Sequence, residues 1–179
     1  MTANSKIKEL LREAWGKRGE KKYDDAQALV KEAHGLFKEE DYNSLGSIFH
    51  VYRQLESDKG NYSKAVELNQ ESLNYFKKGN NMQGITHAMR HLADLQYQIG
   101  KLAGAEGNYR EVIDIYRNNP STHAGNLANG LRGFAVLLEK RGKIIESINV
   151  WKETKELYSS IHLQEGVDEA KNKIASLSK

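Results

Sequence analysis

The stretch His87–Tyr109 reads HAMRHLADLQYQIGKLAGAEGNY, and the fold prediction depends on the pattern it contains. Its apolar and small residues have helical spacing on both sides of Gly100. A glycine at such a junction can adopt a positive φ and end a helix with little strain. The stretch therefore predicts two amphipathic helices joined by a tight turn.

The same pattern recurs along the chain with a period of about 40 residues. From Tyr23 to Tyr62 is 39 positions, from Tyr62 to Leu102 is 40, and from Leu102 to Ile144 is 42. One glycine series and one aromatic series keep this period, namely Gly46, Gly84, Gly125, Gly166 and Phe37, Phe76, Tyr116, Tyr158. A fixed period of this length is typical of stacked helical hairpins.

Composition agrees with an all-helical chain. The 179 residues are 39% hydrophobic and include one proline, and no segment alternates as a strand does. We expect first helices at 4–18, 44–58, 84–98 and 123–140, and second helices at 23–37, 62–77, 102–117 and 144–159. A last helix at 164–177 has one apolar stripe and is predicted to cap the end of the array, with Val167, Ala170, Ile174 and Leu177 on that stripe.

These positions resemble the tetratricopeptide-repeat (TPR) signature. The two repeats that match best do so through Met89, Leu92, Ala93, Gly100, Leu102, Ala105 and Tyr109, and through Leu131, Phe134, Ala135, Gly142, Ile144, Ser147 and Trp151. The second repeat departs from the signature at two positions. Arg53 stands where a small residue is usual, and Asn69 stands where an aromatic residue is usual.

The resemblance implies an all-α fold, an α-solenoid of about four TPR-like helical hairpins with a C-terminal capping helix and a right-handed superhelix. It covers a single domain, 1–179, with repeats at about 4–39, 44–79, 84–118 and 123–160. One hairpin cannot bury its apolar face alone, so the hairpins stack into a continuous core. The concave side, lined by the first helix of each repeat, is the expected binding groove.

The family's groove positions fall on eleven residues of this chain, which we predict to contact a partner: His50, Gln54, Ser57, His87, Arg90, Asp94, Tyr97, Asn129, Arg132, Val136 and Lys140. Arg90 and Arg132 occupy equivalent places in adjacent repeats, so their guanidinium groups could converge on a carboxylate of an acidic segment. The alternative is that Arg90 pairs with Asp94, four residues later on the same helix face.

A metal site is the sharpest chemical alternative. His87, His91 and Asp94 fall near one face of a helix, at the spacing that metal ligands use. The glutamate of the zinc-protease motif is absent between the histidines, and the sequence assigns no fourth ligand. We therefore predict no metal, no cofactor and no catalytic residue.

Charge and hydropathy limit the classes of partner that the chain is expected to bind. The net charge of +3 is spread along the chain, which argues against nucleic-acid binding. No uncharged apolar run approaches the roughly 18 residues of a membrane helix, and Met1–Gly19 lacks the unbroken apolar stretch of a signal peptide. The absence of cysteine favours a cytoplasmic location.

The sequence thus predicts a non-enzymatic module or scaffold that binds a peptide or a partner protein in its groove. A different class of function is self-association into a homodimer through an exposed helix face. A metal-dependent enzyme built on His87, His91 and Asp94 is the third hypothesis.

Overall fold

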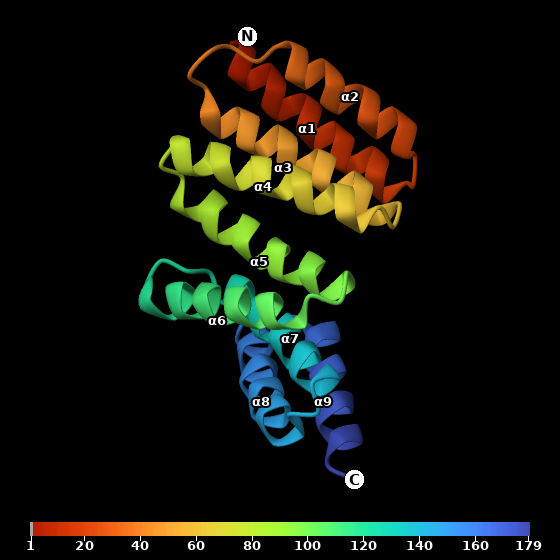
Figure 1. Ribbon diagram of the computed structural model, residues 1–179, viewed down its shortest axis with the longest axis vertical. Helices are drawn as coiled ribbons and strands as arrows, with labels where there is room; N and C mark the ends of the chain where they lie inside the picture. Colours follow the sequence, from red (N-terminus) through yellow and green to blue (C-terminus); the bar gives the residue numbers. More distant parts are fainter. Residues whose placement is uncertain (1) are drawn as a thin grey trace. The chain divides into compact units, whose positions relative to one another are not determined.

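The computed structural model describes residues 2–179 and confirms the all-α prediction (Figure 1). These residues form nine helices joined by short turns, with no strand among them. The helices are α1 (Ala3–Gly19), α2 (Tyr23–Gly35), α3 (Tyr42–Asp58), α4 (Tyr62–Lys78), α5 (Met82–Gln98), α6 (Leu102–Asn118), α7 (Ala124–Lys140), α8 (Ile144–Ser160) and α9 (Gln164–Leu177).

The helices divide into two compact units, Met1–Ile99 and Gly100–Lys179. The first unit contains α1 to α5 and the second contains α6 to α9. The two helices of the expected third repeat, 84–118, therefore belong to different units. The repeat boundaries, the single domain and the superhelical hand stay predictions.

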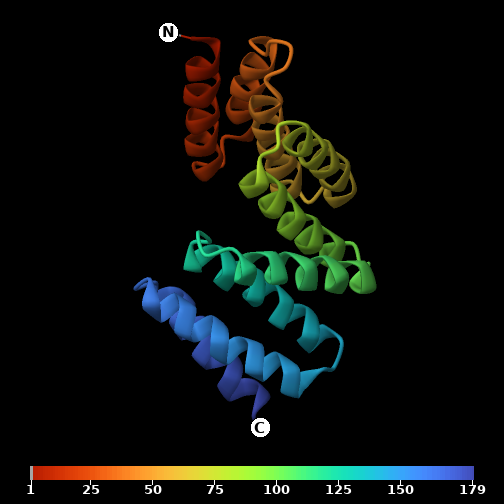
Figure 2. The ribbon, with the colours of Figure 1, turned by 90° about the vertical axis from the view of Figure 1, so that its left-hand side faces the viewer.

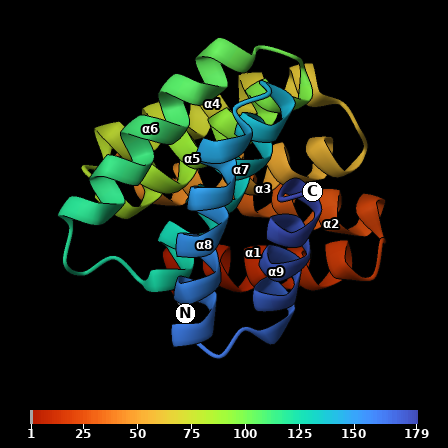
Figure 3. The same ribbon diagram turned by 90° about the horizontal axis from the view of Figure 1, so that it is seen from below.

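Consecutive helices pack against each other within each unit. In the first, α1 pairs with α2 and α3 with α4 as antiparallel hairpins, and α5 lies against α4 and α3 (Figure 2). In the second, α7 and α8 form a hairpin, α6 packs on α7, and α9 packs on α8 (Figure 3). Each helix thus buries its apolar stripe against its neighbours in the chain.

The turns inside the α1–α2, α3–α4 and α7–α8 hairpins have the same backbone geometry. Gly60 and Gly142 have positive φ angles of 79° and 72°. The amide of Asn61 donates to the carbonyl of Glu56 at 2.9 Å, which is the helix-ending pattern that a left-handed residue permits. Lys21 occupies the equivalent position of the first repeat with φ 61°, where a side chain makes the conformation less favourable.

The glycine and aromatic series of the sequence meet each other in the structure. A Cβ atom added at Gly46 would lie 2.6 Å from the ring of Phe76, and one at Gly84 would lie 2.5 Å from the same ring. Gly166 faces the ring of Tyr158 in the same way, at 2.6 Å. Gly46, Gly84 and Gly166 therefore make room for an aromatic ring from a neighbouring helix, whereas the nearest side chains to Gly125 are those of His123 and Ile161.

Buried side chains from successive helices form the cores. In the first unit, α1, α2 and α3 contribute to one cluster, which includes Ile7, Leu10, Ala14, Ala26, Val30, Ile48, Val51 and Leu55. In the second, Ala135, Trp151 and Ala170 connect α7, α8 and α9, with Ile174 and Leu177 packed against them. The apolar stripe of α9 thus lies against the preceding hairpin.

We predict that Gly84→Ala lowers the free energy of unfolding by about 1–3 kcal/mol, because the new methyl group overlaps the Phe76 ring. Gly107→Ala is the matched control. Gly107 is an exposed residue inside α6 with nothing within 4 Å of an added Cβ, so alanine should stabilise the helix by about 0.5–1 kcal/mol. Urea denaturation followed by circular dichroism measures both. Equal effects of the two substitutions would contradict the packing argument.

Candidate functional site

Polar side chains from two neighbouring helices of the first unit meet in one group. Its members lie on α3 and α5 and are linked by hydrogen bonds and ring contacts. We call this group the histidine–arginine cluster, and it consists of His50, Arg53, His87, Arg90, His91 and Asp94.

The three imidazole rings of the cluster are in mutual contact. The ring centroids of His50 and His87 are 4.8 Å apart, those of His50 and His91 are 5.4 Å apart, and those of His87 and His91 are 4.5 Å apart. His87 and His91 are one helical turn apart on α5, whereas His50 comes from α3, so the packing of α3 on α5 completes the group.

The two arginines contact imidazole nitrogens of the cluster. A guanidinium can only donate, and Arg53 Nη2 lies 3.0 Å from His50 Nδ1 and 3.4 Å from His50 Nε2, while His91 Nε2 accepts from Arg90 Nη2 at 2.9 Å. The proton of neutral His91 is then on Nδ1, 3.3 Å from Asp94 Oδ2. His87 Nε2 lies 3.0 Å from the same His91 nitrogen.

Arg53 is the most deeply buried member of the cluster. Its side chain is 2% exposed, and besides His50 it donates from Nη1 to Gln54 Oε1 at 2.6 Å. Its Nε has no hydrogen-bond partner. An unsatisfied buried donor of this kind destabilises a protein by about 1–3 kcal/mol, and more when it is charged.

A second layer of contacts connects Arg53 to α1. Gln54 Nε2 donates to Asp58 Oδ1 at 2.7 Å, and Asp58 accepts from Arg18 Nη2 at 3.1 Å. The guanidinium of Arg18 also lies over the ring of Trp15, 4.8 Å from its centroid. The polar network thus extends from α5 through α3 to α1.

Burial and neighbouring guanidinium groups keep the histidines neutral. Burial is the main cause that lowers the pKa of His87 to about 4, and Arg90 and Arg53 lower it further. The pKa values of His50 and His91 also lie well below the usual range, for the same reasons. Burial and Arg90 lower the pKa of Arg53 to about 9, so Arg53 stays charged at neutral pH.

The cluster therefore carries an excess of positive charge. With the imidazoles neutral, Arg53 and Arg90 contribute two positive charges and Asp94 contributes one negative charge. Arg90 Nη1 donates to Asp94 Oδ2 at 2.9 Å, which is the pairing that the sequence analysis gave as the alternative for Arg90. The cluster keeps a net charge of +1, in surroundings where charge is poorly solvated.

The structure offers three metal-ligating atoms, but in a different set from the one the sequence suggested. One nitrogen each from His50, His87 and His91 lies within 4.8 Å of the others. Asp94 stands outside this set and pairs with Arg90. Two guanidinium groups already donate to ring nitrogens here, and they would repel a divalent cation. The arrangement favours an anion over a metal.

The other predicted groove residues are divided between the two units. In the first unit, Gln54, Ser57 and Tyr97 are half-buried on the helices that carry the cluster. In the second, Asn129 accepts a hydrogen bond from the Tyr158 hydroxyl, and Arg132 donates two hydrogen bonds to Glu169 at 2.6 and 2.7 Å.

Two further groove predictions lie at the end of α7. Val136 packs with Ala135, Trp151 and Ala170. Lys140 is the last residue of the helix and is exposed. Three of the four groove predictions in the second unit thus contact α8 or α9, namely Asn129, Arg132 and Val136.

Arg53 is the residue that sequence reasoning left out of the candidate site. The signal was present, because Arg53 and Asn69 are the two departures from the TPR signature in the second repeat. Both are buried, and each has one polar atom without a partner. Asn69 Nδ2 donates to the carbonyl of Ala88, beside His87, at 2.9 Å and so connects α4 to α5.

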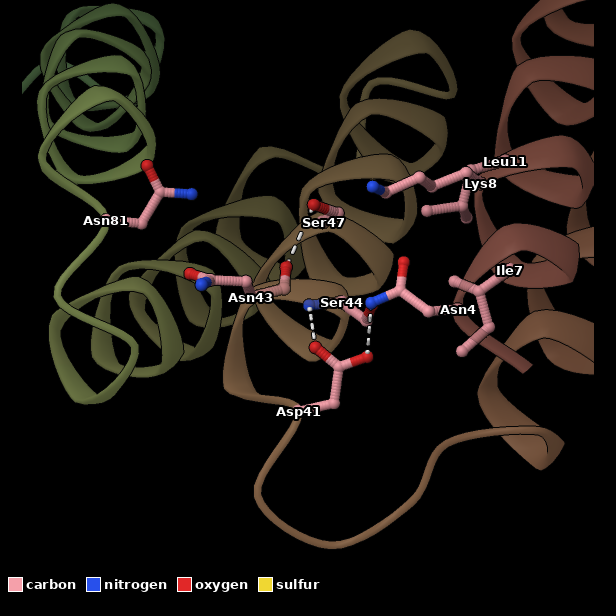
Figure 4. A pocket seen from close by; sticks show the side chains of 9 residues that line it. All are labelled: Asn4, Ile7, Lys8, Leu11, Asp41, Asn43, Ser44, Ser47 and Asn81. Atoms are coloured by element: carbon pink, nitrogen blue, oxygen red, sulfur yellow. Dashed lines mark hydrogen bonds between the residues drawn. The ribbon is translucent and has the colours of Figure 1, made fainter. Parts of the chain in front are cut away.

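A polar hollow of 340 Å³ lies in the first unit at the starts of α1 and α3 (Figure 4). Asp41 accepts hydrogen bonds from the Asn4 side chain at 3.1 Å and from the Ser44 amide at 3.2 Å. Lys8 of α1 and Asn81, which precedes α5, lie on opposite sides of it. The hollow adds donors and acceptors to the helices that carry the cluster.

Comparisons with solved structures identify the class of fold. BtubC (BKLC) from P. vanneervenii superposes with a TM-score of 0.69 at 16% identity, covering 98% of this chain and 89% of that one. The nearly identical TPR-like repeats of a predicted kinesin light chain from Podosopora anserina also give 0.69, at 13% identity, covering 99% and 97%. A point variant of that protein gives the same TM-score and identity, with 96% of its chain covered.

The chain therefore has the TPR-like helical-repeat fold that its sequence resembles. At this level of identity the likeness concerns the fold, and a fold does not by itself carry a function. No protein-family model matches the sequence. No curated protein matches it either. Within the part of the chain that the structure describes, no helix has the length and apolarity needed to cross a membrane.

We predict that the free energy of unfolding falls as the pH is lowered below about 6.5. The unfolded histidines bind protons near pH 6.5, whereas folded His87 does so only near pH 4, so acid favours the unfolded chain. Each buried histidine contributes up to about 1.4 kcal/mol per pH unit in this window. Urea titrations at pH 7.5, 6.0 and 5.0 measure the change.

Two variants assign the pH effect to the cluster. His87→Gln should remove part of the pH dependence, because the glutamine does not titrate. The exposed His34 is the control, and His34→Gln should keep the full dependence. The same loss in both variants would contradict the assignment to the buried histidines.

Proposed function

We propose that this chain is a protein-interaction module that binds a partner through α1, α3 and α5 of its first unit. One observation carries the proposal, namely the histidine–arginine cluster with its excess positive charge. A stable core does not need such a group, because buried apolar residues of similar volume stabilise a fold equally well or better. Its presence on helices with half-buried polar neighbours supports a binding role.

The partner segment is proposed to be a peptide with at least one acidic residue. Arginine is the side chain best suited to a carboxylate, because its planar fork of donors matches the two oxygens. Gln54, Ser57 and Tyr97 add polar and aromatic contacts along the same helices. The 340 Å³ hollow supplies further hydrogen-bonding groups at the helix starts.

Site-specific photo-crosslinking tests this proposal. A photoreactive amino acid at Ser57 or Tyr97 should capture the same partner protein in extracts of native cells, because both positions lie on the proposed face. The control position is Gln70, which is exposed on α4. We expect no capture of that partner from Gln70. Equal capture from all three positions, or from Gln70 alone, would show that another surface is used.

Self-association is the second candidate function, and one observation favours it. At the start of α8, Ile144 is 36% exposed and Ile145 is 80% exposed, so two large apolar side chains face solvent side by side. A twofold contact between two copies would bury both.

If this surface mediates dimerisation, light scattering should report twice the monomer mass at micromolar concentration, and Ile145→Lys should restore the monomer. A monomeric mass for the unsubstituted chain up to about 100 μM would exclude a dimer with physiological affinity.

A further inference from the structure

The start of α8 carries an apolar side chain that the second unit leaves in solvent. Ile145, the second residue of this helix, is 80% exposed. The second residue of α2, α4 and α6 is Asp24, Ser63 and Ala103 respectively, so the other three helices have a small or polar residue there. The position therefore tolerates polar residues in this fold, and α8 alone among the four projects a large apolar group from it.

The start of α6 offers a surface that such a side chain can contact. Ala103 and Gly107, one helical turn apart, are both exposed, and a Cβ atom added at Gly107 would have nothing within 4 Å. They occupy the same positions in α6 that Ile145 and Asn149 occupy in α8, so the two helices present these residues on equivalent faces. A helix surface without large side chains lets a second helix approach closely.

α6 and α8 lie side by side and run in the same direction (Figure 3). Arg110 of α6 donates to Glu146 of α8 at 2.8 Å. Two turns further along both helices, Arg117 donates to Glu153 at 2.7 Å. The Cα atoms of the two helices are nowhere within 8 Å of each other, and a hollow of 230 Å³ lined by the buried Phe134 lies between them. A twofold axis along this hollow places α6 of each copy against α8 of the other.

We infer, on the basis of the self-association proposed as the second candidate function, that this face of the second unit is the contact surface of a homodimer. In the contact, Ile145 of one copy lies over Gly107 of the other, where the missing side chain leaves room for it. The twofold axis repeats the contact, so each dimer buries two such isoleucines. Removal of this apolar surface from water drives the association.

The charged residues that follow on both helices fit the same register. In the contact of isoleucine with glycine, the α8 residue is numbered 38 above the α6 residue. The same offset places Lys152 opposite Asp114, and an offset of 39 places Glu156 opposite Arg117. All four are exposed. Arg117 already donates to Glu153 in its own chain, and its guanidinium has donors enough for a second carboxylate. Pairs of opposite charge thus follow the apolar contact along the helices.

The face is complementary to itself, which makes a second copy its expected occupant. The projecting isoleucine and the stripe of small residues lie on neighbouring helices of one unit, and so do the matching charges. One twofold rotation brings all of them together at the same time. A partner of another kind would use only one half of this pattern.

Engineered cysteines test the contact, because the chain has none of its own. Gly107→Cys and Ile145→Cys are prepared as separate full-length variants and mixed at about 100 μM in a glutathione redox buffer. We expect a disulfide-linked dimer in the mixture and little in either variant alone, because the register pairs position 107 with position 145 and neither with itself. Gln70→Cys, exposed on α4 of the first unit, is the control and should form no such dimer with either variant.

Sedimentation equilibrium measures whether the small side of the contact matters. Gly107→Gln favours the α6 helix but occupies the space that Ile145 needs, so the dimer Kd should rise about tenfold or more. Gly16→Gln is the matched control, because Gly16 is also exposed inside a helix with nothing within 4 Å of an added Cβ. It should leave the Kd unchanged. Equal effects of the two substitutions would contradict the contact.

Charge reversal tests the register. Lys152→Glu and Asp114→Lys should each raise the Kd about threefold to tenfold, because two exposed pairs per dimer become pairs of like charge. In a mixture of the two variants, the heterodimer regains opposite charges at both contacts and should form in preference to either homodimer. No such preference would show that these residues do not face each other. Because the two substitutions are on separate chains, contacts within one chain cannot produce the preference.

Further outcomes keep this contact separate from self-association as such. If the chain dimerises but the mixed disulfide does not form, or if Ile145→Cys alone forms it equally well, the copies associate in another arrangement and only the α6–α8 contact is wrong. A monomeric mass up to about 100 μM would remove both. If the chain stays monomeric and Ile145→Cys forms a disulfide with another protein of a native cell extract, the face serves a different partner, and the homodimer is again wrong.

Discussion

The contact of an aromatic ring with a glycine on the neighbouring helix is the constraint on which the rest of the structure depends. Phe76 of α4 fills the space that missing side chains leave at Gly46 of α3 and Gly84 of α5. Protein interiors are packed too closely for a methyl group to be added there without movement. The same contact recurs between Tyr158 and Gly166, so both units use it to set how closely successive helices approach.

The close approach of α3 and α5 explains the polar cluster between them. His50 and His87 are 37 positions apart in the chain, yet their ring centroids are 4.8 Å apart. At that distance the imidazoles exclude water from one another, and burial becomes the main cause of their lowered pKa values. Packing between apolar helix stripes thus creates an unusual electrostatic environment, in which Arg90 pairs with Asp94 while Arg53 donates to Gln54 and His50.

The structural comparisons separate fold from function. Chains that are only 13–16% identical to this one share its fold over nearly the whole length. Few positions are therefore needed to specify the helical repeat, and the remaining surface is free to vary. Arg53 and Asn69 show this freedom, because both replace usual core residues and both are accommodated with one unsatisfied polar atom. Function in such a fold is carried by the particular side chains on its helices.

The sequence by itself determined the helical class and the TPR-like fold, because these depend on local periodicity, on glycines at helix ends and on regularly spaced aromatic residues. It also placed His87 and His91 on one face of a helix, since residues four apart must lie together. Only the tertiary structure brought His50 into contact with these two histidines. It also paired Asp94 with Arg90 and buried Arg53 with an Nε that has no hydrogen-bond partner. Those features depend on which side chains meet across helices nearly 40 residues apart, and helix packing decides that, because helical periodicity relates only residues on the same helix.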